Sequence, residues 1–430
     1  MKQTQIYTLQ RFRKLFYILG MLLSAGIIFF WQDNRNMIEA FGEVQARGPG
    51  AIPATASGEL RGVWISYLEW NEIPVEQQAF QATINEMYDN VRAMGMNAVF
   101  VHVRPDSDAM YPSAHFPWSK FASGQQGVSP GYDPLAYAVQ AAHDRGLEFH
   151  AWINPYRVTG YLMSYEELAD NNPAKVWLTD QEAGNDRWVL LHNGSHYYNP
   201  AIPEVRQLIT AGVQEIVDNY PVDGIHFDDY FYPSVDNNQD TLWFDKPEYD
   251  QSGSTLSISQ WRRQNVNELV SGVYKTVKET KPDVVFGISP AGYLSNLRSD
   301  SMLFADVDTW MTQPGYIDYI MPQLYWGFDA KLKNQTPAPY AYRENLAAWI
   351  NLAGQGDVKL YLGLAMYRAG SDIADNNPVS EWLQSQDIIK RQVEAARLTQ
   401  KVDGYCFFSY QSFFQEHARQ EKDNLLSILQ

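Results

Sequence analysis

The sequence contains almost no cysteine and has a deficit of positive charge. Cys406 is the single cysteine in 430 residues, so an intrachain disulfide framework is excluded and a zinc-thiolate site is not expected. It lies in the apolar string GYCFFSY, where we interpret it as a small buried residue. There are 33 Lys and Arg against 50 Asp and Glu, which gives a net charge of −17. Such a surface repels phosphate backbones, so nucleic acid is not an expected partner.

Apolar and aromatic residues, in contrast, are plentiful. Hydrophobic residues make up 45% of the chain and charged residues 19%, which is typical of a globular protein with a large core. The 13 Trp and 27 Tyr have flat faces that fill a core and also stack on sugar rings. The length would suffice for several average domains, but α/β barrels often use it as one.

An uncharged apolar run covers residues 15–31, and Arg11, Arg13 and Lys14 precede it. The run is at the short end of the roughly 17–25 residues that a membrane-spanning helix needs. Basic residues before such a run predict a cytoplasmic N-terminus and an exported remainder. We therefore expect a single-pass anchor in the cell membrane.

The alternative is a cleaved signal peptide, for which the small residues Ser24, Ala25 and Gly26 are the candidate cleavage region. Residues 1–31 are thus predicted to be a cytoplasmic stub with an anchor or a signal sequence. Residues 32–58 are rich in Gly, Pro, Ala and Asn and are predicted to be a flexible linker. Both alternatives place the rest of the chain outside the cytoplasm, either tethered or secreted.

Eight β-rich strings follow one another after the linker. They lie at residues 61–70, 97–105, 147–157, 223–233, 284–292, 318–328, 359–370 and 403–413. Segments with apolar residues at every third or fourth position, as in residues 204–220 and 261–280, lie between them. Alternating strands and helices imply right-handed crossovers and a parallel sheet. Eight such units without a Gly-rich phosphate-binding motif predict an α/β fold, a closed (β/α)8 TIM barrel over residues 59–430.

Polar side chains recur at every second position of several predicted strands. They are His102 and Arg104, then His150, Trp152 and Asn154, then His226 and Asp228, and finally Gln323 and Tyr325. Because the residues between them are mostly apolar and suited to packing on helices, we expect the polar set to face the barrel lumen. Active sites of such barrels lie at the C-terminal strand ends. The three histidines show no local metal-ligand spacing, so neither a metal nor a cofactor is expected.

Two adjacent carboxylates, Asp228 and Asp229, end the fourth predicted strand, and Asp223 begins it. In a partly desolvated site two such groups repel each other, so one keeps a proton near neutral pH. A general acid that protonates a glycosidic oxygen needs this state. We therefore interpret Asp228 and Asp229 as the catalytic residues of a glycosidase. Asp223, at the opposite end of the strand, is predicted to be a turn or cap residue.

The sequence leaves open which group acts together with the general acid. Glu69, Asp106, Asp108 and Asp329 follow other predicted strands and are alternative second carboxylates, although solvated loop charges fit the same pattern. A substrate with an N-acetyl group at C2 can itself supply the nucleophile. In that case one acid and one orienting carboxylate are sufficient, which an adjacent pair provides.

The strings RGVWISYLEW, FVHVRPDSDAMYPS, HAWINPYR, DGIHFDDYFYP, GISPAG and YIMPQLYW, taken together and in this order, resemble the glycoside hydrolase-like family 10. The resemblance spans residues 59–430. It implies an exported TIM-barrel enzyme that acts on bacterial cell-wall glycan, similar to glycosidases of peptide-free peptidoglycan strands. It also implies an acidic centre at Asp228 and Asp229, with a cleft lined by Arg104, Asp108, Asn154 and Gln323.

The full set of expected substrate-binding residues is Arg104, Asp108, His150, Trp152, Asn154, His226, Tyr230, Gln323, Tyr325 and Trp326. The predicted function is hydrolysis of glycosidic bonds in an extracytoplasmic polysaccharide such as peptidoglycan glycan. One alternative is a catalytically inactive carbohydrate-binding barrel, which the aromatic excess also fits. Another is a lytic or transglycosylating enzyme on the same substrate.

Overall fold

The computed structural model describes residues 58–160, 163–233, 244–334, 336–371 and 380–429. The predicted anchor and nearly all of the predicted linker lie outside these residues. The chain divides into residues 1–52 and residues 53–430, and all described residues belong to the second unit. Within the described ranges, no helix has the length and apolar character needed to cross a membrane.

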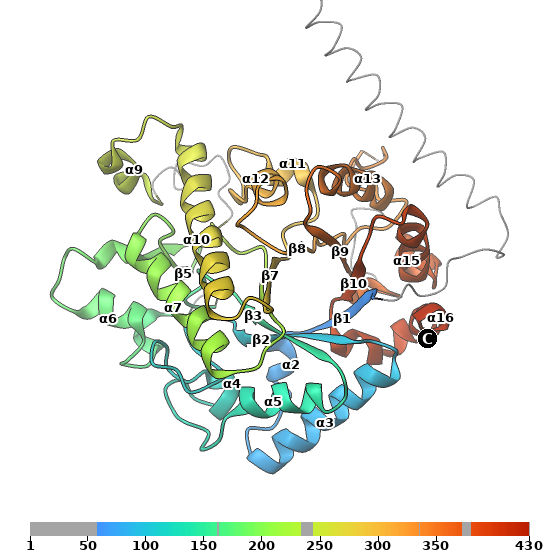
Figure 1. The fold of residues 1–430 in the computed structure, drawn as a ribbon, viewed down its shortest axis with the longest axis horizontal. Helices are drawn as coiled ribbons and strands as arrows, with labels where there is room; N and C mark the ends of the chain where they lie inside the picture. Colours follow the sequence, from blue (N-terminus) through green and yellow to red (C-terminus); the bar gives the residue numbers. More distant parts are fainter. Residues whose placement is uncertain (1–57, 161–162, 234–243, 335, 372–379, 430) are drawn as a thin grey trace, which may run out of the picture. The chain divides into compact units, whose positions relative to one another are not determined.

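Eight parallel strands close into a barrel, as the sequence predicts (Figure 1). They are β1 (Leu60–Ile65), β2 (Ala98–Arg104), β3 (Glu148–Ile153), β6 (Gly224–Phe227), β7 (Val285–Ile288), β8 (Tyr319–Ile320), β9 (Lys359–Leu364) and β10 (Gly404–Phe407). Their order around the barrel follows the chain, and β10 pairs with β1 to close it. Each strand lies within or begins next to one of the eight predicted strings, which confirms the barrel.

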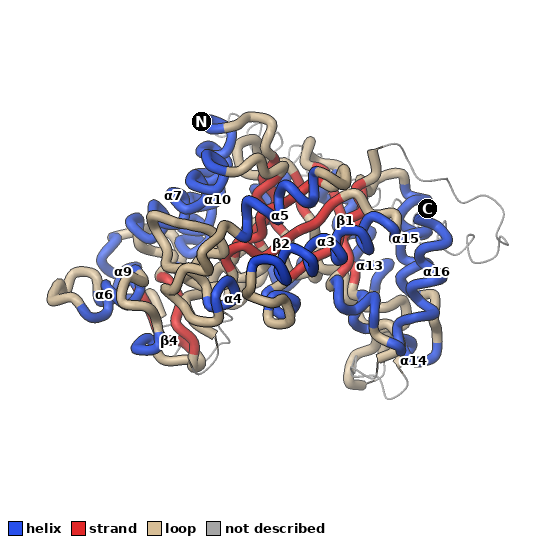
Figure 2. The backbone as a smooth tube through the Cα atoms, turned by 90° about the horizontal axis from the view of Figure 1, so that it is seen from below, coloured by secondary structure: helices blue, strands red, loops and turns tan. Residues whose placement is uncertain are grey.

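A main helix follows each barrel strand and lies on the outside of the barrel (Figure 1). These helices are α3 (Gln77–Ala93), α5 (Pro134–His143), α7 (Pro203–Asn219), α10 (Ile258–Thr280), α12 (Val307–Thr312), α13 (Tyr342–Ala353), α15 (Ile388–Thr399) and α16 (Arg419–Leu429). Figure 2 shows α3 and α5 running across β1 and β2. In α7 the buried residues Val205, Ile209, Val213 and Ile216 form the inward stripe that the sequence period predicts.

Shorter elements occupy the loops. They are α2 (Tyr67–Trp70), α4 (Lys120–Ser123), α6 (Pro173–Thr179), α9 (Lys246–Ser252), α11 (Leu294–Leu297), α14 (Glu381–Gln384), and the 3-10 turns η1 (Tyr165–Glu167), η2 (Asp186–Trp188), η3 (Met366–Arg368), η4 (Tyr410–Phe414) and η5 (Glu416–Ala418). After β3 the chain also forms a hairpin of β4 (Val189–His192) and β5 (Ser195–Tyr198). Its turn, Asn193-Gly194, has positive φ at both residues, a strong hairpin signal that the sequence analysis missed.

The lumen of the barrel is filled with side chains. Trp64, Phe100, Trp152, Tyr319 and Tyr361 belong to one buried cluster. Glycines on the strands make room for these rings: a Cβ at position 62 would lie 2.6 Å from the Phe100 ring, and one at position 287 would lie 2.3 Å from the Tyr319 ring. The interior is therefore a packed core, and chemistry is confined to the strand ends and their loops.

At the N-terminal end of the barrel, a short polar side chain precedes every second strand. The residues are Asn97, Asp223, Asp318 and Asp403, and each accepts a hydrogen bond from the backbone N–H of the neighbouring strand, at 2.7, 2.7, 2.7 and 2.9 Å respectively. The donors are Arg61, Phe149, Phe286 and Leu360. These contacts join the strands in pairs, and they confirm the capping role expected for Asp223.

Replacement of Asp223 by alanine is expected to lower the free energy of unfolding by about 1–2 kcal/mol, because the Phe149 N–H loses its acceptor. Asp223→Asn keeps an acceptor oxygen, as Asn97 does in the equivalent place, and should stay close to wild type. Urea unfolding of the two variants measures this difference. Equal stability of Asp223→Ala and wild type would contradict the capping role.

Candidate active site

Asp228 and Asp229 follow directly after β6, at the C-terminal end of the barrel. Asp228 is 3% exposed, whereas Asp229 is partly exposed. The Oδ2 atom of Asp228 accepts a hydrogen bond from the Trp152 indole Nε1 at 3.0 Å, and the Asn154 amide Nδ2 lies 3.5 Å from it. The Oδ1 atom accepts from the backbone N–H of Tyr230 at 3.1 Å. Neutral donors from β3 and from the following loop thus hold this carboxyl group.

Burial changes the ionisation of both carboxyl groups. It raises the pKa of Asp228 to about 7, and the charge of Asp229 adds to the rise, while hydrogen bonds from the Tyr230 N–H and Trp152 oppose it. Burial also raises the pKa of Asp229 to about 6, and a hydrogen bond from Gln323 opposes this. Two neighbouring groups of this kind share a proton near neutral pH. The pair can therefore offer both a proton and a negative charge.

Arg157 forms the next charged element beside the pair. Its Nε donates to Asp106 Oδ1 at 2.9 Å, and its guanidinium carbon lies 5.2 Å from the ring centroid of Tyr67 and 5.8 Å from that of Tyr230. The Tyr230 side chain is 49% exposed, which fits the predicted contact with substrate. Arg157 also lowers the pKa of Asp228. Asp106, an alternative second carboxylate, is thus neutralised by an ion pair.

Residues after β8 approach the pair from across the barrel. The Gln323 side-chain amide donates to the Ser289 carbonyl at 3.1 Å, and Gln323 lies near enough to Asp229 to lower the pKa of that carboxyl group. Burial, with a contribution from the Asp229 charge, raises the pKa of the Tyr325 phenol, so Tyr325 also lies near the pair. The ring of Trp326 packs against Tyr340, with 5.1 Å between ring centroids. The structure therefore places Gln323 and Tyr325 at the acidic pair, and it places Trp326 in a small apolar cluster of the same loop.

Two predicted substrate-binding histidines lie below the site, inside the packed lumen. His226 is fully buried; its Nε2 accepts from Trp64 Nε1 at 3.1 Å, and its Nδ1 lies 2.9 Å from the Tyr319 hydroxyl. The Nε2 of His150 lies 3.2 Å from Glu148 Oε2, at the start of β3. The structure places both rings deeper than the acidic pair, and their contact with substrate stays a prediction. Strand alternation identifies the face of a side chain but not its depth in the barrel.

Arg104, unlike the two histidines, does not face the lumen. A β-bulge separates His102 from Arg104, so Arg104 pairs with Ile153, a residue of the outward face. Its guanidinium lies 4.3 Å from the Phe116 ring centroid and against Gly212 of α7, where a Cβ would lie 2.5 Å from Nη1. The expected lumen position is therefore wrong, because the extra residue of the bulge reverses the alternation.

Asp108 is 1% exposed and accepts from Gln126 Nε2 at 3.0 Å, while its Oδ1 has no hydrogen-bond partner. Burial raises its pKa to about 7, and the charge of Asp106 contributes. The structure thus places this predicted substrate-binding residue beneath the surface of the loop after β2. Its contact with substrate stays a prediction.

Glu69 is a structural residue rather than a second catalytic carboxylate. It is 2% exposed and forms the capping box of α2 with Ser66. Its other oxygen accepts from the Ser409 hydroxyl and from the backbone N–H of Gln411. The contacts with Ser66 and those across the barrel closure together occupy both oxygens. Asp329, the last alternative, is exposed in the loop after β8.

Sequence reasoning did not assign Arg157 and Tyr67 to the site. Both stand just beyond a strand end, where alternation no longer predicts direction. The signal for Arg157 was its place in the string HAWINPYR. In the part of the chain that the structure describes, no group of three or more His, Cys, Asp or Glu side chains is arranged to hold a metal ion.

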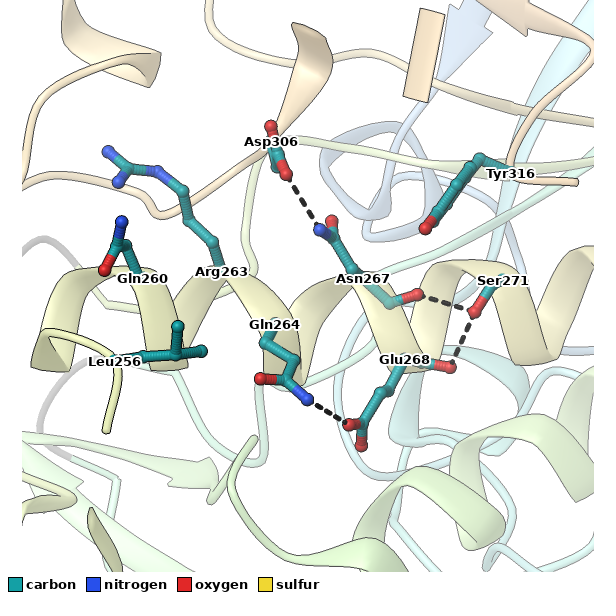
Figure 3. A pocket seen from close by; sticks show the side chains of 9 residues that line it. All are labelled: Leu256, Gln260, Arg263, Gln264, Asn267, Glu268, Ser271, Asp306 and Tyr316. Atoms are coloured by element: carbon teal, nitrogen blue, oxygen red, sulfur yellow. Dashed lines mark hydrogen bonds between the residues drawn. The ribbon is translucent and has the colours of Figure 1, made fainter. Parts of the chain in front are cut away.

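A separate hollow of about 350 Å³ lies on the outside of the barrel, along α10 (Figure 3). Its lining is Leu256, Gln260, Arg263, Gln264, Asn267, Glu268, Ser271, Asp306 and Tyr316. Polar groups here bind one another: Asn267 donates to Asp306 at 2.8 Å, and Gln264 donates to Glu268 at 3.2 Å. Since the hollow is on the outer face of a barrel helix, away from the strand ends, we do not assign it to catalysis.

The barrel and its acidic pair define a class of protein, the TIM-barrel glycosidases. The comparisons with known proteins agree with this class. The profile of the glycosyl hydrolase-like 10 family matches residues 59–383, and the chain belongs to this family. The protein is a glycosidase.

Relatives cover most of the chain. The glycosyl hydrolase YngK of Bacillus subtilis is 37% identical over 384 residues, which cover 84% of this chain and 70% of the relative. The glycosyl hydrolase DigH of Escherichia coli K12 is 31% identical over 394 residues, which cover 84% of this chain and 85% of the relative.

Solved structures show the same fold at low identity. The glycoside hydrolase domain of PgaB (BpsB) from Bordetella bronchiseptica has a TM-score of 0.55 at 13% identity, covering 85% of this chain and 99% of that domain. The β-amylase catalytic domain from Paenibacillus polymyxa has a TM-score of 0.54 at 10% identity, covering 88% of this chain and all of that domain.

Asp108→Asn is expected to stabilise the protein at high pH. Because folding raises the pKa of Asp108 from 3.8 to about 7, the folded state retains a proton that the unfolded chain releases. The free energy of unfolding therefore falls as the pH rises through this window. At pH 8 the variant should melt about 2 °C or more above wild type, and at pH 4 the two should coincide. A gain of the same size at both pH values in thermal unfolding would refute this account.

Proposed function

We propose that the protein hydrolyses glycosidic bonds of an extracytoplasmic polysaccharide at Asp228 and Asp229, and that this substrate is a bacterial cell-wall glycan built from N-acetylated sugars. The observation that carries the proposal is the adjacent carboxyl pair at the end of β6, where burial raises the pKa of Asp228 to about 7 and that of Asp229 to about 6. The resemblance of the sequence to glycosidases of peptide-free peptidoglycan supports the choice of glycan. Residues 15–31 fit a tether that holds the barrel outside the cytoplasm.

The two aspartates have different environments, and these suggest different roles. Donors from three residues contact Asp228, so its oxygens are occupied and its negative charge is stabilised. Asp229 is more exposed and can approach a glycosidic oxygen. When Asp229 holds the proton, its charge no longer raises the pKa of Asp228. In the proposed reactive state, Asp229 is the acid and Asp228 is ionised. Because the pKa of Asp228 is the higher of the two, about 7 against about 6, this is the less populated of the two singly protonated forms.

In the proposed reaction, Asp229 transfers its proton to the glycosidic oxygen as the bond from that oxygen to C1 breaks. The carbonyl oxygen of the C2 acetamido group forms the new bond to C1, and Asp228 accepts a hydrogen bond from the acetamido N–H. Water then attacks C1, the bond from C1 to the acetamido oxygen breaks, and Asp229 takes up the proton that the water releases. The products are two shorter saccharides and the starting enzyme.

The surroundings of the pair support a nucleophile supplied by the substrate. Glu69 caps α2, Asp106 is paired with Arg157, and Asp108 is buried in its loop. Three of the four alternative second carboxylates are therefore engaged elsewhere. An N-acetyl group on the sugar fills the role that they leave open.

Asp229→Asn is expected to lower kcat on peptide-free peptidoglycan strands by about 10³-fold, because the amide cannot donate the proton. Asp228→Asn should also lose most activity, since the orienting charge disappears. The measurement is release of short saccharides by the full-length protein, followed by mass spectrometry. Asp223→Asn, on the same strand but at its opposite end, is the matched control and should keep wild-type turnover.

Wild-type turnover by both Asn variants at positions 228 and 229 would contradict the assignment. Strands that are chemically de-N-acetylated test the second half of the proposal. They should bind but resist cleavage, and equal cleavage of both strand types would show that a protein carboxylate is the nucleophile. Products analysed in ¹⁸O-labelled water distinguish hydrolysis from lytic or transferring cleavage, because only hydrolysis adds the label.

A further inference from the structure

His102 lies inside the barrel, directly against Trp152. The two rings are stacked, with 3.8 Å between their centroids and 4° between their planes. Tyr67 covers another side of the imidazole, with 5.8 Å between ring centroids. His102 is only 1% exposed. The ring is therefore enclosed by aromatic neighbours next to the acidic pair.

Neither ring nitrogen of His102 has a hydrogen-bond partner. Burial, with smaller contributions from Arg157 and His226, holds the pKa of His102 well below its ordinary value, so the ring is neutral. An enclosed polar atom without a partner is destabilising. The contacts that the imidazole makes are ring contacts, and the nearer of them is the parallel stack on the Trp152 indole.

The stack is connected to the carboxyl pair through the Trp152 indole. Trp152 is held face-on by His102, and the edge of the same indole donates to Asp228 Oδ2 at 3.0 Å. A planar ring on one face limits rotation and tilt of the indole, which is what a directional N–H bond requires. Asn154 lies further from the same oxygen, at 3.5 Å, so Trp152 is its nearer side-chain donor.

We propose that His102 is a positioning residue of the active site: by stacking on Trp152, it fixes the indole N–H on Asp228 and so keeps the orienting carboxylate in place. It acts through Trp152 and needs no contact with substrate. The inference rests on the proposed role of Asp228, and it adds a residue whose contribution comes from ring shape rather than from its nitrogens.

The test compares His102→Leu, which removes the stack, with His102→Phe, which keeps a flat ring and removes both nitrogens. Both are made in the full-length protein, and thermal unfolding confirms the fold of each. If His102→Leu does not fold, His102→Gln takes its place, because it also removes the ring and is expected to behave in the same way. The first readout needs no substrate: the indole N–H signal of Trp152 in a ¹H–¹⁵N spectrum, assigned with Trp152→Phe, is followed against pH.

In wild type this signal should titrate with Asp228. In His102→Leu its midpoint should move upward by about half a pH unit or more, because a weaker donor stabilises the ionised form less. In His102→Phe the midpoint should stay at the wild-type value. An unchanged midpoint in His102→Leu would overturn the proposal, whether or not the glycan assignment is right.

The second readout is turnover of peptide-free peptidoglycan strands. His102→Leu should lower kcat about tenfold through misplacement of the carboxylate, with KM within about twofold of wild type. His102→Phe should restore kcat. A folded His102→Phe protein as impaired as His102→Leu would show that the nitrogens matter, which also overturns the proposal. A failure of all proteins, wild type included, on this glycan would refute the substrate and leave the spectroscopic result standing.

Discussion

The packed lumen of the barrel is the constraint on which the site depends. Trp64, Phe100, Tyr319 and their neighbours fill the interior, so solvent does not reach the pair from below. Asp228 rests on top of this core and becomes desolvated there. The same packing that stabilises the fold therefore raises the pKa of the acidic pair, and a carboxyl group able to give up a proton near neutral pH results from it.

Much of the architecture follows from short-range patterns. The eight β-rich strings correspond to the eight barrel strands, because each strand is short and bounded by polar loops. Alternation correctly brings Trp152, Asn154 and Asp228 together, since neighbouring strands in register present the same face at the same level. The acidic pair at the end of β6 could therefore be predicted from the sequence alone.

The remaining features depend on information that a local pattern does not contain. The bulge after His102 turns Arg104 outward, and nothing in the alternation marks it. The depth of His150 and His226 depends on strand stagger, which is set by the closure of the whole barrel. Arg157 packs against the aromatic rings of Tyr67 and Tyr230. These three residues lie beyond the strand ends, where tertiary contacts set the direction of the backbone. In the sequence alone, Glu69 resembles a loop carboxylate. The fold shows its structural role, because β10 brings Ser409 into contact with it.

The central claim is that Asp228 and Asp229 share one proton near neutral pH, and the most direct measurement of it is ¹³C NMR of carboxyl-labelled aspartate in the full-length protein. The signals of the two residues are identified by their loss in Asp228→Asn and Asp229→Asn. The account predicts two coupled titrations with midpoints well above the ordinary value of 3.8, at about 6 and about 7. Independent titration of both groups near 3.8 would contradict it, because neither would then hold a proton for the glycosidic oxygen.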